Sequence, residues 1–115
     1  MSVTIYHNPR CSKSRAGLAL LEEKGVEVNI VEYLKTPPST DELRDILAKL
    51  GISPRDVMRR GEAVYKELAL DDPDKSDDDL IQAIVDNPIL LERPIVVSGN
   101  KAAIGRPTET ILKLI

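Results

Sequence analysis

The chain lacks the residues that most often fill a hydrophobic core, because it contains no phenylalanine, no tryptophan and only three tyrosines. Its core must therefore be assembled from leucine, isoleucine, valine and alanine. No apolar run approaches the roughly 20 residues that a membrane-spanning helix needs. The first residues also lack the basic start and long apolar stretch of a secretory signal. We expect a globular protein that does not act at a membrane.

Cysteine and histidine are equally scarce, with one of each in 115 residues. A single cysteine cannot form an internal disulfide, so a reducing, cytoplasmic location is the expectation. The formal net charge of −3 argues against non-specific binding of nucleic acid, which needs a basic surface. The stretch DDPDKSDDD, residues 71–79, lacks the glycine and closing glutamate of a calcium-binding loop. We interpret it as a solvated connection and predict no metal site.

Strand-like and helix-like patterns alternate along the chain, and its length indicates one domain over residues 1–115. Three Ser-x-x-Glu/Asp spacings, beginning at Ser39, Ser53 and Ser76, predict helix starts. The expected strands cover residues 3–6, 26–31, 95–97 and 102–104. The expected helices cover residues 12–24, 41–50, 62–70 and 77–85. A further helix is expected to start at residue 54, and a short final helix near Pro107.

This order predicts an α/β fold in which a βαβ unit is followed by helices and then by a ββα unit. The first two strands should be parallel and the last two should form a hairpin. The result is a mixed four-stranded sheet with a helical insertion, at about residues 40–90, between strands two and three. Such an arrangement is that of a thioredoxin-like fold.

The only cysteine lies in YHNPRCSKSR, residues 6–15, between the first expected strand and helix. A thiol at a helix N-terminus faces unpaired amides and the positive end of the helix dipole, and both favour the thiolate. Arg10, Lys13 and Arg15 add positive charge, and residues 1–21 contain no carboxylate. We therefore expect the pKa of Cys11 to lie below the ordinary value of about 8.5.

The cysteine motif is Cys-x-x-Ser, with Ser14 at the position where dithiol oxidoreductases carry a second cysteine. Ser14 can hydrogen-bond a thiolate but cannot resolve a mixed disulfide. A catalytic cycle through Cys11 therefore needs an external thiol, most simply glutathione. Glycine at position 17 excludes the Cys-x5-Arg phosphate loop of low-molecular-weight tyrosine phosphatases.

Two arginines directly precede prolines, Arg93 before Pro94 and Arg106 before Pro107. In a thioredoxin-like sheet the X-Pro bond at the start of the third strand is commonly cis and faces the reactive cysteine. Arg93 is therefore expected to point into the same site. A thiolate beside several arginines suits a tetrahedral oxyanion, because guanidinium groups bind such oxygens in a bidentate manner.

Four segments, YHNPRCSKSR, GISPRDVMRRGE, LIQAIVDNPILLERPIVV and IGRPTETIL, resemble in order and spacing the ArsC-type, glutaredoxin-coupled arsenate reductase family. The HNPRCSKSR segment is most similar to an ArsC-like subgroup of that family. The resemblance implies that Cys11 attacks arsenate and that glutathione and glutaredoxin complete its reduction to arsenite, with glutathione as co-substrate and no bound cofactor. By this resemblance the oxyanion would be bound by Arg59, Arg93 and Arg106, and the thiolate would be supported by His7, Ser14 and Arg15.

Two other functions remain open at this point. One is a glutathione-dependent thiol oxidoreductase with another substrate. The other is a regulator similar to the Spx proteins, which bind RNA polymerase and use a Cys-x-x-Cys redox switch. Ser14 removes that switch, and a regulator has little need for three converging arginines, so arsenate reduction is the favoured hypothesis.

Overall fold

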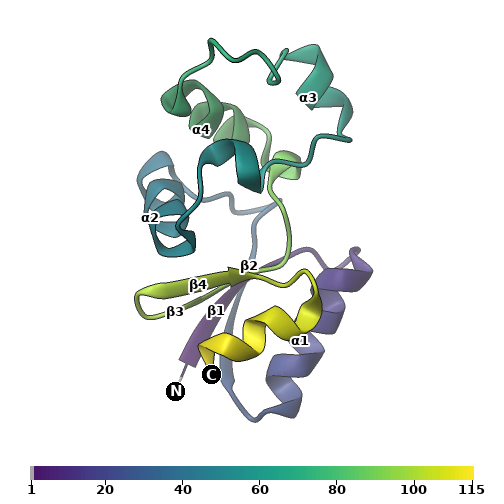
Figure 1. Ribbon diagram of the computed structural model, residues 1–115. Helices are drawn as coiled ribbons and strands as arrows, with labels where there is room; N and C mark the ends of the chain where they lie inside the picture. Colours follow the sequence, from purple (N-terminus) through teal and green to yellow (C-terminus); the bar gives the residue numbers. More distant parts are fainter. Residues whose placement is uncertain (1) are drawn as a thin grey trace. The chain divides into compact units, whose positions relative to one another are not determined.

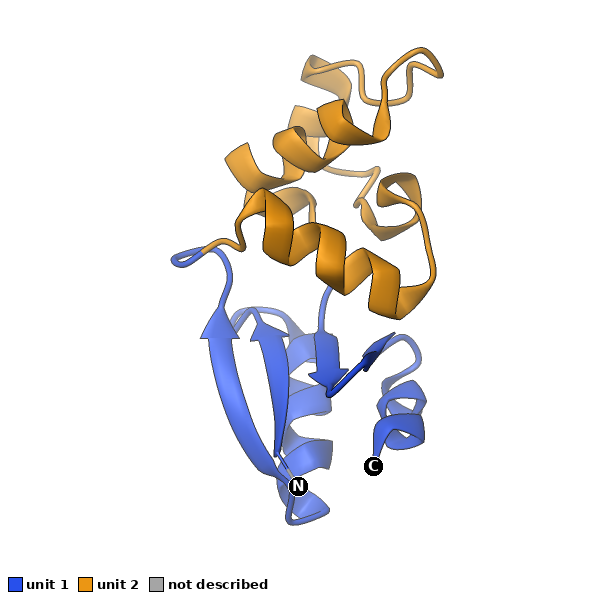
Figure 2. Ribbon diagram, turned by 90° about the vertical axis from the view of Figure 1, so that its left-hand side faces the viewer, with its two compact units in different colours: residues 1–36, 93–115 blue, residues 37–92 orange. Residues whose placement is uncertain are grey.

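The computed structural model describes residues 2–115, which divide into two compact units (Figures 1 and 2). The sheet unit is formed by the two terminal parts of the chain, residues up to 36 and residues 93–115. The helical unit is inserted between them and covers residues 37–92. These bounds extend the insertion expected at about residues 40–90 by a few residues at each end.

The sheet unit contains a mixed four-stranded sheet with the strand order β2-β1-β3-β4. Strand β1 pairs in parallel with β2 and antiparallel with β3, and β3 pairs antiparallel with β4. Strand β1 is an inner strand, so Asn8, which directly follows it, lies near the middle of the end of the sheet at which β1 finishes. The strands are β1 (Ser2–His7), β2 (Glu27–Glu32), β3 (Ile95–Ser98) and β4 (Lys101–Ile104).

Two helical segments complete the sheet unit, α1 (Ser12–Glu23) and the 3-10 helix η3 (Thr108–Leu114). Alternate residues of β1 are buried, and α1 turns one narrow face inward, as the sequence pattern predicts. The segment η3 packs against both α1 and β4 (Figure 1). The core of this unit is formed by Val3, Ile5, Leu21, Val96, Ile111 and Leu114.

The helical unit is organised by the three predicted capping boxes. In each, the serine precedes the first helical residue and is paired with the acidic residue three positions later, at Ser39, Ser53 and Ser76. Apolar faces of α2 and α4 then pack together. The elements are α2 (Thr40–Leu50), η1 (Pro54–Val57), α3 (Ala63–Glu67), α4 (Asp77–Asp86) and η2 (Pro88–Leu90).

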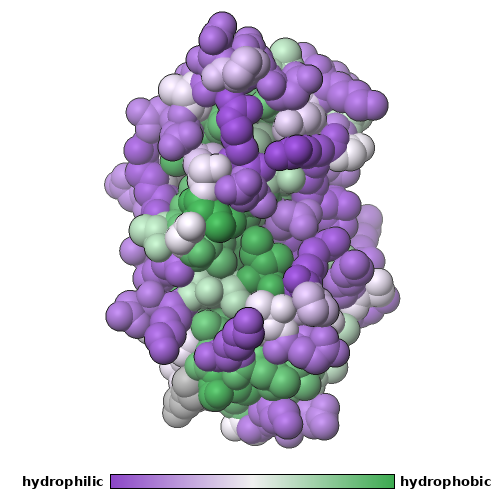
Figure 3. Space-filling model, viewed as in Figure 1, coloured by the Kyte–Doolittle hydropathy of each residue, from purple (hydrophilic) through white to green (hydrophobic). Residues whose placement is uncertain are grey.

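Arg55 organises the acidic loop, by which we mean residues 68–76 between α3 and α4. Its guanidinium donates to the main-chain carbonyls of Leu70, Asp72 and Lys75, at 3.1, 2.7 and 3.1 Å. Polar side chains cover this end of the helical unit (Figure 3). Among residues 2–115 no three potential metal ligands gather, and no helix is long and apolar enough to cross a membrane.

Candidate active site

Cys11 is the N-cap residue of α1, as its position in the sequence predicts. Its backbone is extended, with φ −94° and ψ 123°, and its carbonyl accepts the first helical hydrogen bond, from the amide of Arg15 at 3.0 Å. The approach to the helix is held by local bonds, because the Cys11 amide donates to the Asn8 carbonyl and the Arg10 amide to the Asn8 side chain, both at 3.0 Å. The thiol is partly exposed and therefore accessible to a small reactant.

The surroundings of Cys11 favour its thiolate. Partial burial acts to raise the pKa of the thiol, but the amides of Ser14 and Lys13 and the guanidinium of Arg93 outweigh it, so the pKa lies below its ordinary value. Arg93 contributes both as a hydrogen-bond donor and as a positive charge. The Cys11 side chain does not form the N-cap hydrogen bond that a serine or aspartate forms at this position. The two amides and the guanidinium therefore surround the sulfur as nearby donors. The direction of the shift is the one that the sequence predicts.

Ser14 and His7 form a buried pair behind the thiol. The Ser14 hydroxyl lies 2.6 Å from Nδ1 of His7 and accepts the Asn8 amide hydrogen at 3.0 Å. The pKa of His7 is lowered, first by burial and also by the charge of Arg15, against an opposing effect of Glu32. The Ser14 hydroxyl and Nδ1 of His7 share one hydrogen, and the tautomer of the imidazole determines which of the two donates.

This network changes the hypothesis for how Ser14 supports the thiolate. The sequence suggested a bond from its hydroxyl, whereas the structure places the hydroxyl on His7 and Asn8 and the main-chain amide near the sulfur. Arg15 likewise acts on the loop, because its Nη1 donates to the carbonyl of Pro9 at 3.0 Å. The supporting roles of these residues in catalysis stay predictions.

Arg93 is brought to Cys11 from the start of β3. The Arg93–Pro94 peptide bond is cis, as expected, and the Arg106–Pro107 bond is cis as well. The Nε and Nη1 atoms of Arg93 are buried and have no hydrogen-bond partner among residues 2–115. Buried guanidinium donors are normally satisfied, so two unsatisfied ones beside a thiolate mark a place where an anion can bind.

Arg106 holds the main chain of Arg93 in place. Its Nε donates to the Arg93 carbonyl at 3.1 Å, and the neighbouring Gly105 amide donates to the Pro94 carbonyl at 2.9 Å. The family resemblance implies that both arginines bind the oxyanion, and it does not predict this bond between them. The Arg-Pro dipeptide occurs twice in the sequence, which indicates that the two segments could share a site. The repeat does not predict the hydrogen bond between them.

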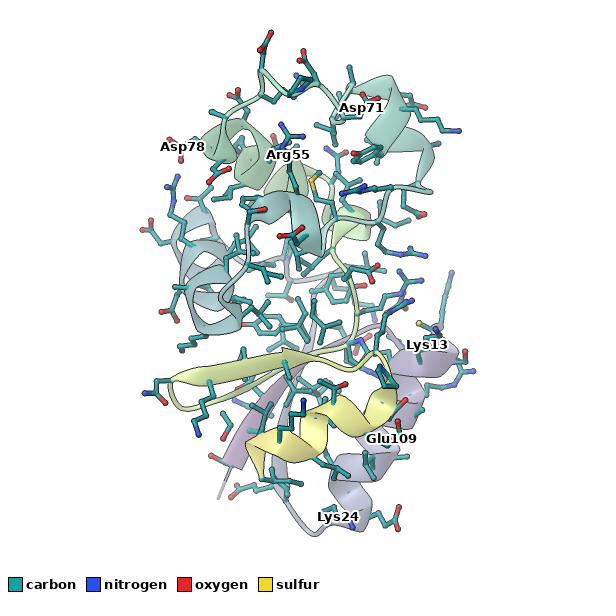
Figure 4. All side chains as sticks on the ribbon, viewed as in Figure 1. Lys13, Lys24, Arg55, Asp71, Asp78 and Glu109 are labelled. Carbon is teal, nitrogen blue, oxygen red and sulfur yellow. The ribbon has the colours of Figure 1, made fainter. Side chains whose placement is uncertain are left out.

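A pocket of about 530 Å³ lies beside this site, within the sheet unit. Its charged lining residues are Lys13 from α1, Arg106 from the turn after β4, and Glu109 from η3. Figure 4 labels Lys13 and Glu109, which lie at the same end of the unit. Two cations and one carboxylate therefore surround a cavity large enough for a small charged ligand.

Arg59, the third arginine implied by the resemblance, belongs to the helical unit. There its Nη1 lies 3.3 Å from Oε1 of Glu62, and its Nε lies 3.7 Å from Oε1 of Glu92. The Arg59 amide also donates to the Leu90 carbonyl at 2.7 Å. Two carboxylates thus balance its charge, and its contribution to oxyanion binding stays a prediction.

The sheet topology, the cysteine at the N-cap of the first helix and the proline directly before the third strand are those of a thioredoxin-like protein with a single cysteine at this position. The model of the ArsC family matches residues 6–114, and the chain belongs to the ArsC family. The fold and the family predicted from the sequence are both confirmed.

Several relatives are similar over all or nearly all of their length. The arsenate reductase of Neisseria meningitidis serogroup A is 56% identical over 110 residues, which are 95% of this chain and 94% of that protein. The arsenate reductase of Haemophilus influenzae is 52% identical over 116 residues and covers both chains completely. The solved structure of an arsenate reductase from Vibrio cholerae is 49% identical, with a TM-score of 0.98 over 100% of this chain and 98% of that one.

Proposed function

We propose that this protein reduces arsenate to arsenite through the Cys11 thiolate, with glutathione and glutaredoxin as the reductants. The observation that carries the proposal is the pair of buried, unsatisfied donors of Arg93 next to the reactive thiol. A tetrahedral oxyanion bound to this guanidinium would satisfy one of the two donors and would present its central atom to a nucleophile. The arsenate reductases among its relatives support arsenate as that oxyanion.

The proposed reaction begins when the Cys11 thiolate attacks the arsenic atom. A sulfur–arsenic bond forms, one oxygen leaves as water after taking up protons, and arsenic remains As(V). A glutathione thiolate then supplies the second sulfur, so that arsenite, As(III), departs and Cys11 is left in a mixed disulfide with glutathione. The two electrons gained by arsenic come from the two thiols, which are oxidised to that disulfide. Glutaredoxin exchanges the glutathionyl group away and restores Cys11.

The charges of the 530 Å³ pocket support glutathione as the co-substrate. Glutathione carries two carboxylates and one ammonium group, and the pocket offers Lys13, Arg106 and Glu109 in the complementary ratio. An external thiol is required because Ser14 cannot resolve the mixed disulfide and the sequence has no second cysteine. This dependence on a reducing thiol pool is the reason to propose the cytoplasm as the site of action.

The test is a coupled assay that follows NADPH consumption with arsenate, glutathione, glutaredoxin and glutathione reductase. The parent protein should turn over, and C11S should lose activity because no other side chain supplies a soft nucleophile. S12A, which changes an exposed neighbour and keeps the thiol, is the matched control and should retain activity. Activity in C11S would contradict the mechanism.

The reductant is tested by omission. Without glutaredoxin the parent protein should stop after one equivalent of arsenite, with Cys11 glutathionylated by mass spectrometry. Continued turnover without glutaredoxin, or an unmodified cysteine, would show that another reductant completes the cycle. A parent protein that is glutathionylated by oxidised glutathione but inert to arsenate would instead favour a thiol oxidoreductase with another substrate.

A further inference from the structure

The Pro94 ring lies close to two backbone positions that have no side chain, Gly17 in α1 and Gly105 directly after β4. A Cβ at Gly17 would lie 2.9 Å from Cγ of Pro94, and a Cβ at Gly105 would lie 2.8 Å from Cγ and 3.2 Å from Cδ of the same ring. Carbon atoms in ordinary contact are about 3.5–4.0 Å apart. Both positions are buried, so a methyl group at either would press on a rigid ring.

The need for glycine at these two positions is one of space and not of backbone conformation. Gly25, Gly51 and Gly99 have φ of 59–70° with no atom near an added Cβ, which is the pattern of a conformational requirement. Gly17 and Gly105 have no such positive φ and have close neighbours instead. Ile111 of η3 lies behind both, 3.9 and 3.5 Å from the two added Cβ positions.

The place of the Pro94 ring determines the place of Arg93, its direct neighbour. The Gly105 amide and the Arg106 side chain already bind the Pro94 and Arg93 carbonyls, so the turn after β4 and the start of β3 move together. The helix α1 carries Gly17 and begins directly after Cys11, its N-cap residue. A displacement of the ring against α1 therefore changes the distance between the guanidinium of Arg93 and the thiol.

We propose that Gly17 and Gly105 are positioning residues for the reactive cysteine, because by leaving room for the Pro94 ring they set the Arg93 guanidinium beside Cys11. A methyl group at either position forces a shift of at least about 0.6 Å before ordinary contact distances return. Arg93 is the charged side chain from outside the cysteine-containing helix that acts on the thiol. Its effect on arsenate turnover rests on the proposed function, whereas its effect on the thiol does not.

The thiol supplies a direct readout, because Cys11 is the single cysteine and its alkylation by iodoacetamide reports the thiolate alone. We expect G17A and G105A to raise the pKa of Cys11, so that alkylation near pH 6 slows severalfold while the limiting rate near pH 10 is unchanged. G61A is the matched control, since an added Cβ there meets no atom within 4 Å and φ is not positive. Unchanged pH profiles in both G17A and G105A would overturn the proposal.

A double-variant cycle with P94A separates positioning from a general loss of stability, because alanine lacks the Cγ and Cδ atoms that an added Cβ would meet. In the P94A background, G105A should shift the alkylation profile far less than it does in the parent protein. An equally large shift in both backgrounds would contradict a role through the ring. If G17A fails to fold, G17A/P94A should fold, and failure of that double variant would also overturn the proposal.

Activity then distinguishes this inference from the proposed function. In G17A and G105A, kcat/KM for arsenate should fall on the order of tenfold, as expected for a sub-ångström misplacement of a binding group. A parent protein without arsenate reductase activity, whose alkylation profile still responds to G105A, would refute the proposed function and keep the inference. Normal arsenate turnover by the parent protein, with alkylation profiles unchanged in both G17A and G105A, would support the proposed function and refute this inference.

Discussion

Replacing Arg93 by methionine should make the protein more stable while removing its affinity for anions. Nε and Nη1 of Arg93 are buried without hydrogen-bond partners among residues 2–115. Methionine is also long and unbranched, and it carries no donor that must be satisfied. The change therefore removes the cost of burying two unsatisfied donors, a cost that an anion bound there would offset.

The magnitude follows from the two donors. Each unsatisfied buried donor costs about 1–3 kcal/mol. Arg93 also favours the Cys11 thiolate, so R93M is best made in the C11S background, where that favourable contact is removed from both sides of the comparison. In that background we expect a gain of about 2 kcal/mol in the free energy of unfolding, which is roughly 5–10 °C in Tm for a domain of this size.

The assay is thermal unfolding of C11S and C11S/R93M, with and without arsenate, which C11S can bind but not reduce. Arsenate at about 100 times its Kd should stabilise C11S by about 2.7 kcal/mol and should leave C11S/R93M unchanged. As a control, K101M changes an exposed cation of β4 and should affect neither quantity. A double variant that is less stable than C11S, or that is still stabilised by arsenate, would refute the assignment of Arg93 as the anion-binding donor.

Three further predictions concern stability. S14A should lower the free energy of unfolding by about 1–3 kcal/mol, because the His7 imidazole and the Asn8 amide lose their shared partner; unchanged urea denaturation would contradict the network. Burial lowers the pKa of His7 in the folded protein, so the contribution of His7 to stability is fully present above the unfolded pKa near 6.5 and is lost as the pH falls from there towards the folded pKa. H7Q should therefore flatten the pH dependence of the free energy of unfolding, measured by urea denaturation, in this window. An unaltered pH dependence in H7Q would contradict this role of His7. R55K keeps the positive charge but loses the planar guanidinium whose two nitrogens bind three main-chain carbonyls. Limited proteolysis should therefore cut the acidic loop severalfold faster in R55K than in the parent protein. Equal cleavage rates would show that other contacts hold the loop.

The features that the sequence could predict depend on local signals. Strand alternation, the capping box that begins at Ser39 and the position of Cys11 before a helix each involve residues a few positions apart. These signals lie within one turn or one strand, so they can be recognised without knowledge of the surrounding fold. The order of these elements along the chain predicts the mixed four-stranded sheet, and the family resemblance implies the same thioredoxin-like fold.

The features that the sequence could not predict depend on residues distant along the chain. The Ser14 hydroxyl could reach either the thiolate or another acceptor, and only the packing of α1 on β1 places His7 beside it. The contact of the Pro94 ring with Gly17 and Gly105 joins three separate segments. Glycine and proline are read from sequence as turn formers, and that reading conceals a requirement for space.

The division of the sheet unit between the two ends of the chain has a consequence for its synthesis. On the ribosome, β1, α1 and β2 emerge first, while β3, β4 and η3 emerge only after the whole helical unit. Until then Cys11 has its helix amides but neither Arg93 nor the Pro94 contact, and β1 lacks one of its two neighbouring strands. In a nascent or truncated chain the pKa of Cys11 is therefore lowered less, and translation of the last segment completes the surroundings that favour the thiolate.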